Sequence, residues 1–219
     1  MLDGESLYPH IPNLIHLYRG GGILGLKHVC DKLNSYPLKY LSEKVDGINV
    51  SISLERGVIK LRSRGGRLIK ERERGKEFKW LLSFYHRNHE KIAENICPGH
   101  VIFLEYVPPP EVKPPYLRFS YGKPFLAFLD LKVKEFIPYE WAEVMVDWLK
   151  NFGVEFIPHI RLNGVKCEDL IELLRQVKVR RSKYGPTRVE GFVLKAYSTK
   201  GHFYVKIKDD DLPLLDVIG

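Results

Sequence analysis

The strongest constraint on the fold of this chain is a run of alternating apolar and polar residues in its first third. The alternation extends from Ile48 to Leu54, and a period of two is typical of a β-strand with one buried face. Arg56-Gly57 then supplies a turn, and residues 58–62 have the pattern of a returning strand. The sequence therefore predicts an antiparallel β-hairpin at this position.

Further strands and helices are expected along the rest of the chain. The expected strands span residues 101–107, 125–133, 191–197 and 203–208, and the expected helices span residues 76–96, 139–151 and 168–179. The segment 108–124 holds six of the fourteen prolines, which excludes a central strand there. Because strands outnumber helices and short turns join several of them, we predict one α+β domain over residues 1–219, with mostly antiparallel sheets flanked by helices.

Charge and cysteine content indicate the setting in which the chain works. The formal net charge of +8 favours a polyanionic partner. The three cysteines lie far apart in the sequence and form no C-x-x-C pair, so we expect a reduced, cytoplasmic setting. No apolar run approaches the roughly 18 residues of a membrane-spanning helix, so no membrane partner is expected. The chain contains a single glutamine, and such a low content of this thermolabile residue is typical of a thermophilic source. The sequence does not determine the oligomeric state.

The tetrad Lys44-Val45-Asp46-Gly47 lies directly before the predicted hairpin. A lysine can attack a nucleotide phosphate only as the neutral amine, and the ordinary pKa of a lysine is about 10.4. Neighbouring cations, a divalent metal ion or burial would favour loss of the proton. If this stretch is extended, Asp46 lies on the same face as Lys44 and could orient it.

Groups that would assist such a lysine occur later in the chain. Arg64, Lys206 and Lys208 would supply cations, both near the amine and opposite the departing pyrophosphate. Glu190 is the candidate metal ligand, since Mg²⁺ prefers carboxylate and phosphate oxygens. Glu105 lies inside an apolar strand pattern, where an unpaired carboxylate is costly, so we expect it to be functional or paired.

The order of these motifs resembles the covalent nucleotidyltransferase superfamily, which comprises polynucleotide ligases and mRNA capping enzymes. The motifs read, in order, Glu43-Lys44-Val45-Asp46-Gly47, Ser63-Arg64-Gly65-Gly66, Glu105, Asp130, Glu190-Gly191-Phe192-Val193-Leu194-Lys195 and Lys206-Ile207-Lys208. Within the superfamily, the Glu43-Lys44 pair is similar to the ATP-dependent RNA ligases of the RNA-ligase-2 type. The resemblance implies the nucleotidyltransferase fold of ligases and capping enzymes, and ATP with Mg²⁺ as cofactors.

The resemblance also implies a role for each matching residue. It assigns catalysis to Lys44, Lys206 and Lys208, metal binding to Glu190, and nucleotide binding to Glu43, Asp46, Gly47, Arg64, Glu105, Phe128, Glu190 and Lys195. Two positions depart from the superfamily pattern. Leu104 stands where glycine usually precedes the glutamate, and Leu129 stands where an aromatic residue usually precedes the aspartate. Phe128, one residue earlier, is then the candidate to stack on the base, although alternation points it to the opposite face from Leu129.

The implied activity is that of an ATP-dependent RNA ligase. AMP would be transferred from ATP to Lys44, passed to a 5′-phosphate end of RNA, and released when a 3′-hydroxyl seals the strand. Only eleven residues follow Lys208, too few for the five-stranded OB-fold domain of DNA ligases and capping enzymes, so we expect a nucleotidyltransferase domain alone. A minimal DNA ligase, a guanylyltransferase and a catalytically silent nucleic-acid-binding module are the alternatives.

Three other patterns have simpler explanations. Residues 20–25 fit the dinucleotide motif G-x-G-x-x-G, but a hairpin follows instead of a βαβ unit, so we expect a loop. His86 and His89 lie three residues apart on an expected helix without further zinc ligands, so we expect a solvated face. The run from Asp209 to Asp211 is expected to be a solvated end.

Two segments have the composition of a nucleic-acid contact. The stretch 62–76 is cationic but diluted by glutamates, and a solvated surface would have the same pattern. The loop from Lys113 to Lys123 interleaves basic and aromatic residues, which suits phosphate contact and base stacking. A packed surface loop is the equally weighted alternative for it, and residues 178–183 add a further basic cluster.

Overall fold

The computed structural model describes residues 8–18, 23–70, 75–119 and 121–218. The chain is α+β, as predicted, and it divides into two compact units, each built around one β-sheet. Unit 1 is formed by Asp46–Ile157 together with the start of the chain up to Pro9, and unit 2 by His10–Val45 and Pro158–Gly219. Most of unit 1 is thus inserted, along the chain, between the two segments of unit 2. The expectation of one domain over residues 1–219 stays a prediction.

The sheet of unit 1 has six strands in the order β3-β2-β4-β5-β6, with β7 beside β5. Its strands are β2 (Ile48–Glu55), β3 (Val58–Ser63), β4 (His100–Val107), β5 (Phe125–Val133), β6 (Glu135–Phe136) and β7 (Glu155–Phe156). The described pairings are antiparallel except that of β5 with β7. The predicted hairpin is confirmed as β2–β3, and its turn places Arg56 and Gly57 at positive φ angles of 50° and 76°.

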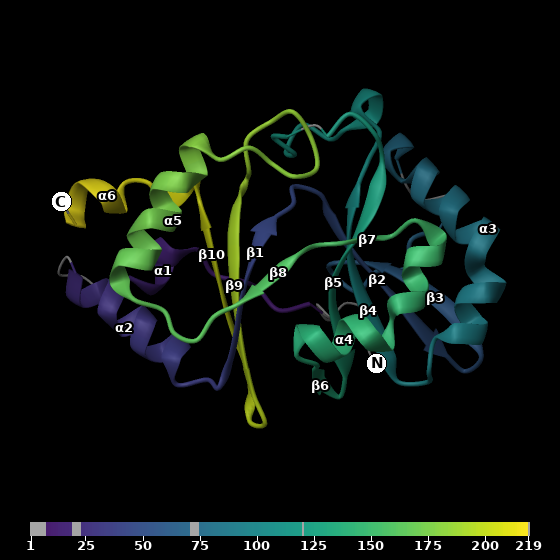
Figure 1. Ribbon diagram of the computed structural model, residues 1–219. Helices are drawn as coiled ribbons and strands as arrows, with labels where there is room; N and C mark the ends of the chain where they lie inside the picture. Colours follow the sequence, from purple (N-terminus) through teal and green to yellow (C-terminus); the bar gives the residue numbers. More distant parts are fainter. Residues whose placement is uncertain (1–7, 19–22, 71–74, 120, 219) are drawn as a thin grey trace. The chain divides into compact units, whose positions relative to one another are not determined.

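Helices pack against this sheet and enclose the core of unit 1 (Figure 1). They are α3 (Lys79–Asn95), preceded by the 3-10 turn η2 (Lys76–Phe78), and α4 (Tyr139–Met145), continued by η4 (Asp147–Phe152). The core holds completely buried side chains from both layers, among them Leu81 of α3, Leu149 of η4, and Ile102 and Phe128 of the sheet. Both helices lie where the sequence predicts them, and Gly153 ends η4 at a φ angle of 76°.

The sheet of unit 2 has four antiparallel strands in the order β10-β9-β1-β8. Its strands are β1 (Leu38–Lys44), β8 (His159–Arg161), β9 (Gly191–Ser198) and β10 (Gly201–Lys208). The helices of this unit are α1 (Leu14–Leu17), α2 (Ile23–Asn34), α5 (Cys167–Val179) and α6 (Leu214–Ile218), with the turn η5 (Asp209–Asp211) directly after β10. The sequence predicted β9, β10 and α5, but neither α2 nor β1. None of the described helices, in either unit, combines the length and the hydropathy that a bilayer crossing requires.

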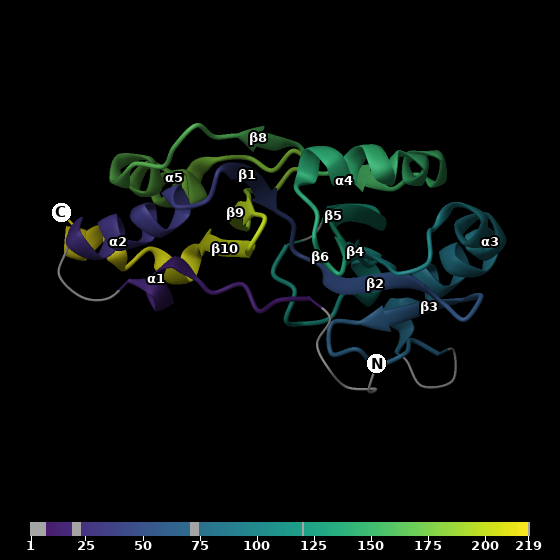
Figure 2. The same ribbon diagram turned by 90° about the horizontal axis from the view of Figure 1, so that it is seen from below.

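The two faces of the unit 2 sheet differ in character. Apolar residues such as Leu41, Phe192, Leu194 and Val205 alternate onto one face and pack with α2 and α5, which lie side by side (Figures 1 and 2). The intervening residues project to the opposite face, because side chains alternate along a strand and paired residues of neighbouring strands point to the same side. The lysines of the predicted site belong to this opposite face, which we call the lysine face.

Candidate active site

Lys44 and Glu190 form an ion pair inside unit 2. Lys44 is the last residue of β1, and Glu190 directly precedes β9, the strand paired with β1. The Lys44 ammonium contacts Glu190 Oε2 directly, and the two side chains are only 22% and 13% exposed. The structure therefore brings the predicted nucleophile and the predicted metal ligand together, although they lie 146 residues apart in the sequence.

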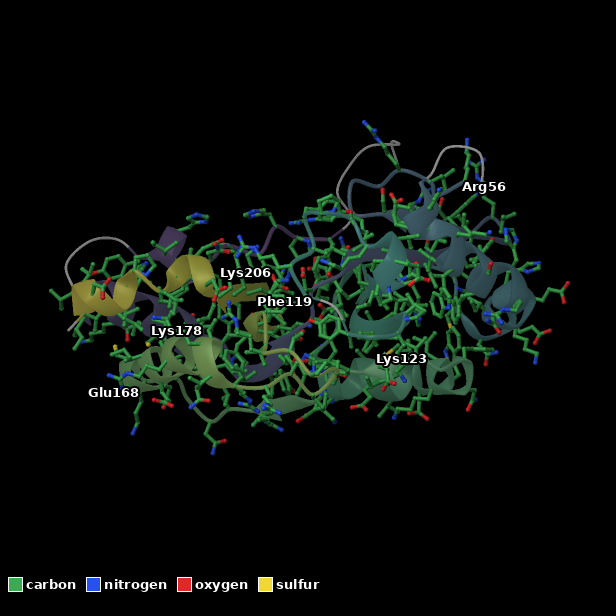
Figure 3. All side chains as sticks on the ribbon, turned by 90° about the horizontal axis from the view of Figure 1, so that it is seen from above. Arg56, Phe119, Lys123, Glu168, Lys178 and Lys206 are labelled. Carbon is green, nitrogen blue, oxygen red and sulfur yellow. The ribbon has the colours of Figure 1, made fainter. Side chains whose placement is uncertain are left out.

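Two more predicted lysines share the lysine face with Lys44. The register of β1, β9 and β10 places Lys44, Gly191 and Lys208 in one row. Lys206 lies in the next row on the same face and is labelled in Figure 3. Gly191 lies between Lys44 and Lys208 in the first row and has no side chain to fill the space between them. A Cβ atom on Gly191 would lie 2.1 Å from the carbonyl oxygen of Ile207. The close approach of β10 therefore excludes any larger residue at this position.

Lys195 is the fourth predicted lysine and also lies on the lysine face. Its side chain is 3% exposed, and its ammonium lies 5.7 Å from the ring centroid of Tyr204, its register partner on β10. A cation above an aromatic face is attracted by the ring quadrupole, which favours this direction of the side chain. The predicted contact of Lys195 with a base edge stays a prediction.

Glu43 projects to the opposite face of the sheet from Lys44, because neighbouring strand residues alternate. Its carboxylate accepts a hydrogen bond from the Ser182 hydroxyl and another, at 3.1 Å, from the backbone N–H of Lys183. Glu43 thereby fixes the start of the loop that connects α5 to β9 and that carries part of the predicted basic cluster. Sequence reasoning missed Ser182, and a direct contact of Glu43 with the nucleotide stays a prediction.

The acidic run after β10 is held by ion pairs and by the buried Asp211, so the prediction of a solvated end is wrong except for the exposed Asp210. Asp209 and Arg188 form two hydrogen bonds of 2.8 and 2.6 Å. A carboxylate oxygen of Asp210 lies 2.5 Å from the ammonium of Lys208. Both carboxylates fix the end of β10, and Asp210 balances the charge of Lys208 on the lysine face.

Asp211 is the buried centre of this acidic run. Its side chain is completely buried and accepts the backbone N–H groups of Ile15 at 2.7 Å and of Lys208 at 2.8 Å. Burial raises the pKa of the Asp211 carboxyl above its ordinary value, and the two N–H groups oppose this rise. Asp211 thus joins α1 to the strand that carries two of the predicted catalytic lysines.

Replacing Asp211 with alanine should lower the free energy of unfolding by about 2–4 kcal/mol, because two buried N–H groups would lose their acceptor. Urea denaturation of the wild type and the variant at neutral pH measures the difference. Asp216, which is exposed on α6, provides the matched control, and Asp216→Ala should change the free energy by less than about 0.5 kcal/mol. Equal stabilities of Asp211→Ala and the wild type would contradict this role.

In unit 1, Gly47 and Glu105 are in direct contact. The Gly47 N–H donates a hydrogen bond of 3.2 Å to Glu105 Oε1, and Glu105 is 9% exposed. A Cβ atom on Gly47 would lie 2.7 Å from both the Glu105 Cγ and the Tyr106 carbonyl oxygen, so the chain passes too close to β4 for another residue. Glu105 is therefore paired, as the sequence required of a carboxylate inside an apolar strand.

Asp46 anchors the proline-rich loop 108–124. Its carboxylate Oδ2 accepts the backbone N–H groups of Arg118 at 2.6 Å and of Phe119 at 2.8 Å. The Asp46 N–H donates to the hydroxyl of Tyr121 at 2.9 Å, and Asp46 itself is 7% exposed. The aspartate of the tetrad thus positions the loop predicted to contact nucleic acid, a role that the sequence did not reveal. Phe119 is labelled in Figure 3.

Phe128 is enclosed in the core of unit 1. It is completely buried, with ring centroids 5.7 Å from Tyr139 and 5.0 Å from Phe156. A ring enclosed in this way presents no face to a base, so the structure does not support the predicted stacking role. The reason is alternation, since Phe128 pairs with Leu104 and both project into the core.

The cationic stretch 62–76 is divided between different roles. Arg62 is 7% exposed and donates hydrogen bonds to the Glu55 carboxylate at 2.9 Å and to the Gly66 carbonyl at 3.2 Å. Its guanidinium is therefore paired with residues of the hairpin and of the turn that follows it. Arg64 is exposed in the turn that follows β3, and its predicted contact with the nucleotide stays a prediction. Residues 71–74 lie outside the described residues.

The competing metal and dinucleotide patterns gain no support. His86 and His89 are exposed on α3, as predicted for a solvated face. Across the described ranges, no three His, Cys, Asp or Glu side chains come together as metal ligands. Residues 20–22 of the glycine pattern lie outside the described residues. Residues 23–25 form the start of α2, so the expectation of a loop is wrong for this part of the pattern.

Comparison with solved structures identifies the fold. An RNA ligase from Naegleria gruberi, solved as a variant with AMP and Mn, matches with a TM-score of 0.62 and 16% identity, covering 96% of this chain and 60% of that one. The same ligase with pyrophosphate matches with a TM-score of 0.59 and 15% identity, covering 94% and 60%. A candidate ATP-dependent DNA ligase from Aquifex aeolicus matches with a TM-score of 0.54 and 21% identity, covering 95% and 51%. The predicted ligase-type nucleotidyltransferase fold is thus confirmed.

Sequence comparison identifies the family. No significant match was found among curated proteins. The chain spans only about 60% of the length of the Naegleria ligase, so these likenesses describe the fold of the shared part. A family model for RNA ligases matches residues 40–208, which include every residue of the predicted site. This chain therefore belongs to the RNA ligase family.

Proposed function

We propose that the protein is an ATP-dependent RNA ligase in which Lys44 receives AMP. The observation that carries the proposal is the Lys44–Glu190 pair, on a sheet face that also presents Lys206 and Lys208. An ordinary exposed turn would leave such a lysine in solvent, without a partly buried carboxylate beside it. Membership of the RNA ligase family supports the same assignment, and the Naegleria RNA ligase has been solved with ATP and Mn.

The proposed first step is an attack by Lys44 on the α-phosphorus of ATP. A bond forms between Nζ and phosphorus, the bond to the bridging oxygen of the β-phosphate breaks, and pyrophosphate leaves with the electron pair. In its ion pair with Glu190, Lys44 is an ammonium, and it must release a proton to solvent before its nitrogen can attack. Lys206 and Lys208 lie on the same face, where their charge would stabilise the phosphate oxygens during transfer.

Glu190 also fits the role of a divalent-metal ligand. Its carboxylate supplies the oxygen that Mg²⁺ and Mn²⁺ prefer, and the side chain is partly exposed. Since the described residues contain no complete cluster of protein ligands, the other ligands would be phosphate oxygens and water. A bound divalent ion would neutralise charge on the triphosphate.

The later steps concern the polynucleotide. AMP would pass from Lys44 to a 5′-phosphate end of RNA, and a 3′-hydroxyl would then displace AMP and seal the strand. The likeness to the candidate DNA ligase from Aquifex aeolicus makes DNA the second candidate substrate. A guanylyltransferase would use GTP in the same first step.

Labelled nucleotides test the proposal. With Mg²⁺ present, ATP labelled in the α-phosphate should leave acid-stable label on the protein, and GTP should not. Label from GTP alone would indicate a guanylyltransferase, and label from neither would indicate a silent binding module. Nicked, single-stranded and splinted RNA and DNA then identify the polynucleotide, and we expect sealing of RNA in preference to DNA.

The loop 108–124 is the proposed contact surface for the RNA strand. Tyr121 is buried and holds the loop to unit 1, whereas Tyr116 is 67% exposed and Arg118 and Lys123 are also exposed. The loop therefore has both a packed part and a solvated part. A packed surface loop and a nucleic-acid contact, the two interpretations of its sequence, are thus compatible. Exposed rings can stack on bases while exposed cations contact phosphates. Lys123 is labelled in Figure 3.

Raising the salt concentration should slow strand joining more than AMP transfer to the protein, because phosphate contacts weaken steeply with ionic strength. The double variant Arg118→Gln/Lys123→Gln should lower joining about 10-fold and leave AMP transfer within about twofold. The measurement is the ratio of the two rates across a salt series. Lys79→Gln/Lys91→Gln removes the same charge from exposed positions on α3 and should leave both rates unchanged. A parallel fall of both activities in the loop variant would show that the loop is not a strand-binding surface.

A further inference from the structure

Cys30 and Cys167 face each other inside unit 2. Cys30 lies in α2, and Cys167 is the first residue of α5, next to Glu168, which is labelled in Figure 3. Their sulfur atoms are 3.9 Å apart, although the residues are separated by 137 positions. Cys30 and Cys167 are therefore neighbours in the folded protein, although all three cysteines lie far apart in the sequence.

The two thiols differ in accessibility. Cys30 is 4% exposed and belongs to the apolar core of unit 2. Burial raises the pKa of the Cys30 thiol to about 12, and the neighbouring Cys167 adds to the rise, so Cys30 is protonated at neutral pH. Cys167 is partly exposed, which makes it the more accessible of the two thiols.

The pair joins the two segments from which unit 2 is built. Cys30 belongs to His10–Val45 and Cys167 to Pro158–Gly219, and the chain between them runs through all of Asp46–Ile157. Packing of α2 against α5 is one of the contacts that hold these segments together. A bond between the sulfur atoms would make that contact covalent.

We propose that Cys30 and Cys167 are a redox-active pair that forms a disulfide and thereby staples the two segments of unit 2. A disulfide bond is about 2.0 Å long, so the sulfur atoms must approach each other by roughly 2 Å. Rotation of the two side chains within their packed helices supplies such a movement. The proposal does not depend on the ligase activity, since neither thiol lies on the lysine face.

The co-reactant is a low-molecular-weight disulfide such as oxidised glutathione. Cys167 loses its proton and attacks one sulfur of the reagent, whose disulfide bond breaks and releases the first thiol. The Cys30 sulfur then attacks the Cys167 sulfur of this mixed disulfide, loses its proton, and releases the second thiol. The protein loses two hydrogen atoms with their electrons, and the reagent is reduced to two thiols.

Mass spectrometry and chemical cleavage test the bond directly. Reduced protein treated with oxidised glutathione should become lighter by two hydrogen atoms at Cys30 and Cys167. Cyanogen bromide cleaves after Met145, the second of the two methionines, and so separates the part with Cys30 from the part with Cys167. In the oxidised protein these fragments should stay joined until a reductant is added. Accumulation of glutathione on Cys167 without joined fragments would overturn the proposal.

Single substitutions identify the two sulfur atoms. Cys30→Ala should stop at the mixed disulfide on Cys167, and Cys167→Ser should give neither that adduct nor joined fragments. Cys97 is exposed in unit 1, so Cys97→Ser is the matched control and should still give joined fragments. Loss of the joined fragments in Cys97→Ser would overturn the assignment of the pair.

Thermal unfolding tests whether the bond acts as a staple. The oxidised wild type should melt about 10 °C above the reduced wild type, because a bond that closes a long loop restricts the unfolded chain. Neither Cys30→Ala nor Cys167→Ser should show this shift on oxidation. The comparison within the wild type needs no substitution, so it stands even where a variant folds poorly. Equal melting temperatures of the reduced and the fully oxidised wild type would overturn the stapling role.

Discussion

Replacement of Lys44 by alanine is expected to abolish the labelling of the protein by ATP that carries label in its α-phosphate. Without the Nζ atom, no nitrogen–phosphorus bond can form at this position, so the rate should fall to background, by at least about 10³-fold. Mass spectrometry of the labelled wild type should locate AMP on Lys44. Label that persists in Lys44→Ala, or that maps to another lysine, would show that the nucleophile lies elsewhere.

The variant Lys44→Arg separates chemistry from folding. Arginine keeps a positive charge opposite Glu190, so the ion pair and the end of β1 should be preserved. Its guanidinium stays protonated and cannot attack phosphorus, so labelling should again be lost. Lys178→Ala, at an exposed position near the end of α5, is the matched control and should label like the wild type. Circular dichroism of all three variants should confirm that the fold is intact.

The elements that could be predicted from the sequence have local signals. The alternation from Ile48 to Leu54 and the turn after it specify the hairpin without reference to any distant residue. Strand β1 was missed because it lies between β8 and β9 and buries the polar residues Lys39 and Ser42, which removes a clean alternation. Helix α2 was missed because it follows a glycine-rich segment and contains Gly25, and glycine weakens a helical pattern.

The candidate site could be predicted from the order of its motifs, but the partners of its carboxylates could not. Glu43 finds Ser182 at a separation of 139 residues, and Asp46 finds the Arg118 N–H at a separation of 72. From the sequence, each of these carboxylates could bind a ligand or could hold a loop in place. The partner lies far away in the sequence, so the neighbouring residues do not distinguish the two roles. The folded structure supplies these partners, and in it Glu43 holds the loop after α5 while Asp46 holds the loop 108–124.

Glu190→Ala is expected to slow AMP transfer by about 10²–10³-fold at saturating ATP and ordinary magnesium. Phosphoryl transfer needs charge neutralisation on the triphosphate, and the variant lacks the carboxylate proposed to hold the divalent ion. The partly buried Lys44 ammonium would also lose its partner, so circular dichroism must show that the fold survives. Glu172→Ala, exposed on α5, removes the same charge and should leave the rate unchanged.

A magnesium titration separates the two roles of Glu190. If the Glu190 carboxylate holds the ion, Glu190→Asp should need more Mg²⁺ for its half-maximal rate, because the aspartate side chain is shorter. Chelation of Mg²⁺ should then reduce the rate of the wild type to the level of Glu190→Ala. If Glu190 acts only on Lys44, Glu190→Asp should be slower at every concentration without a change in the Mg²⁺ requirement. Near-wild-type rates for Glu190→Ala at ordinary magnesium would contradict both roles. The contact between Glu190 and Lys44 would then be an ion pair that only fixes the end of β1 beside β9.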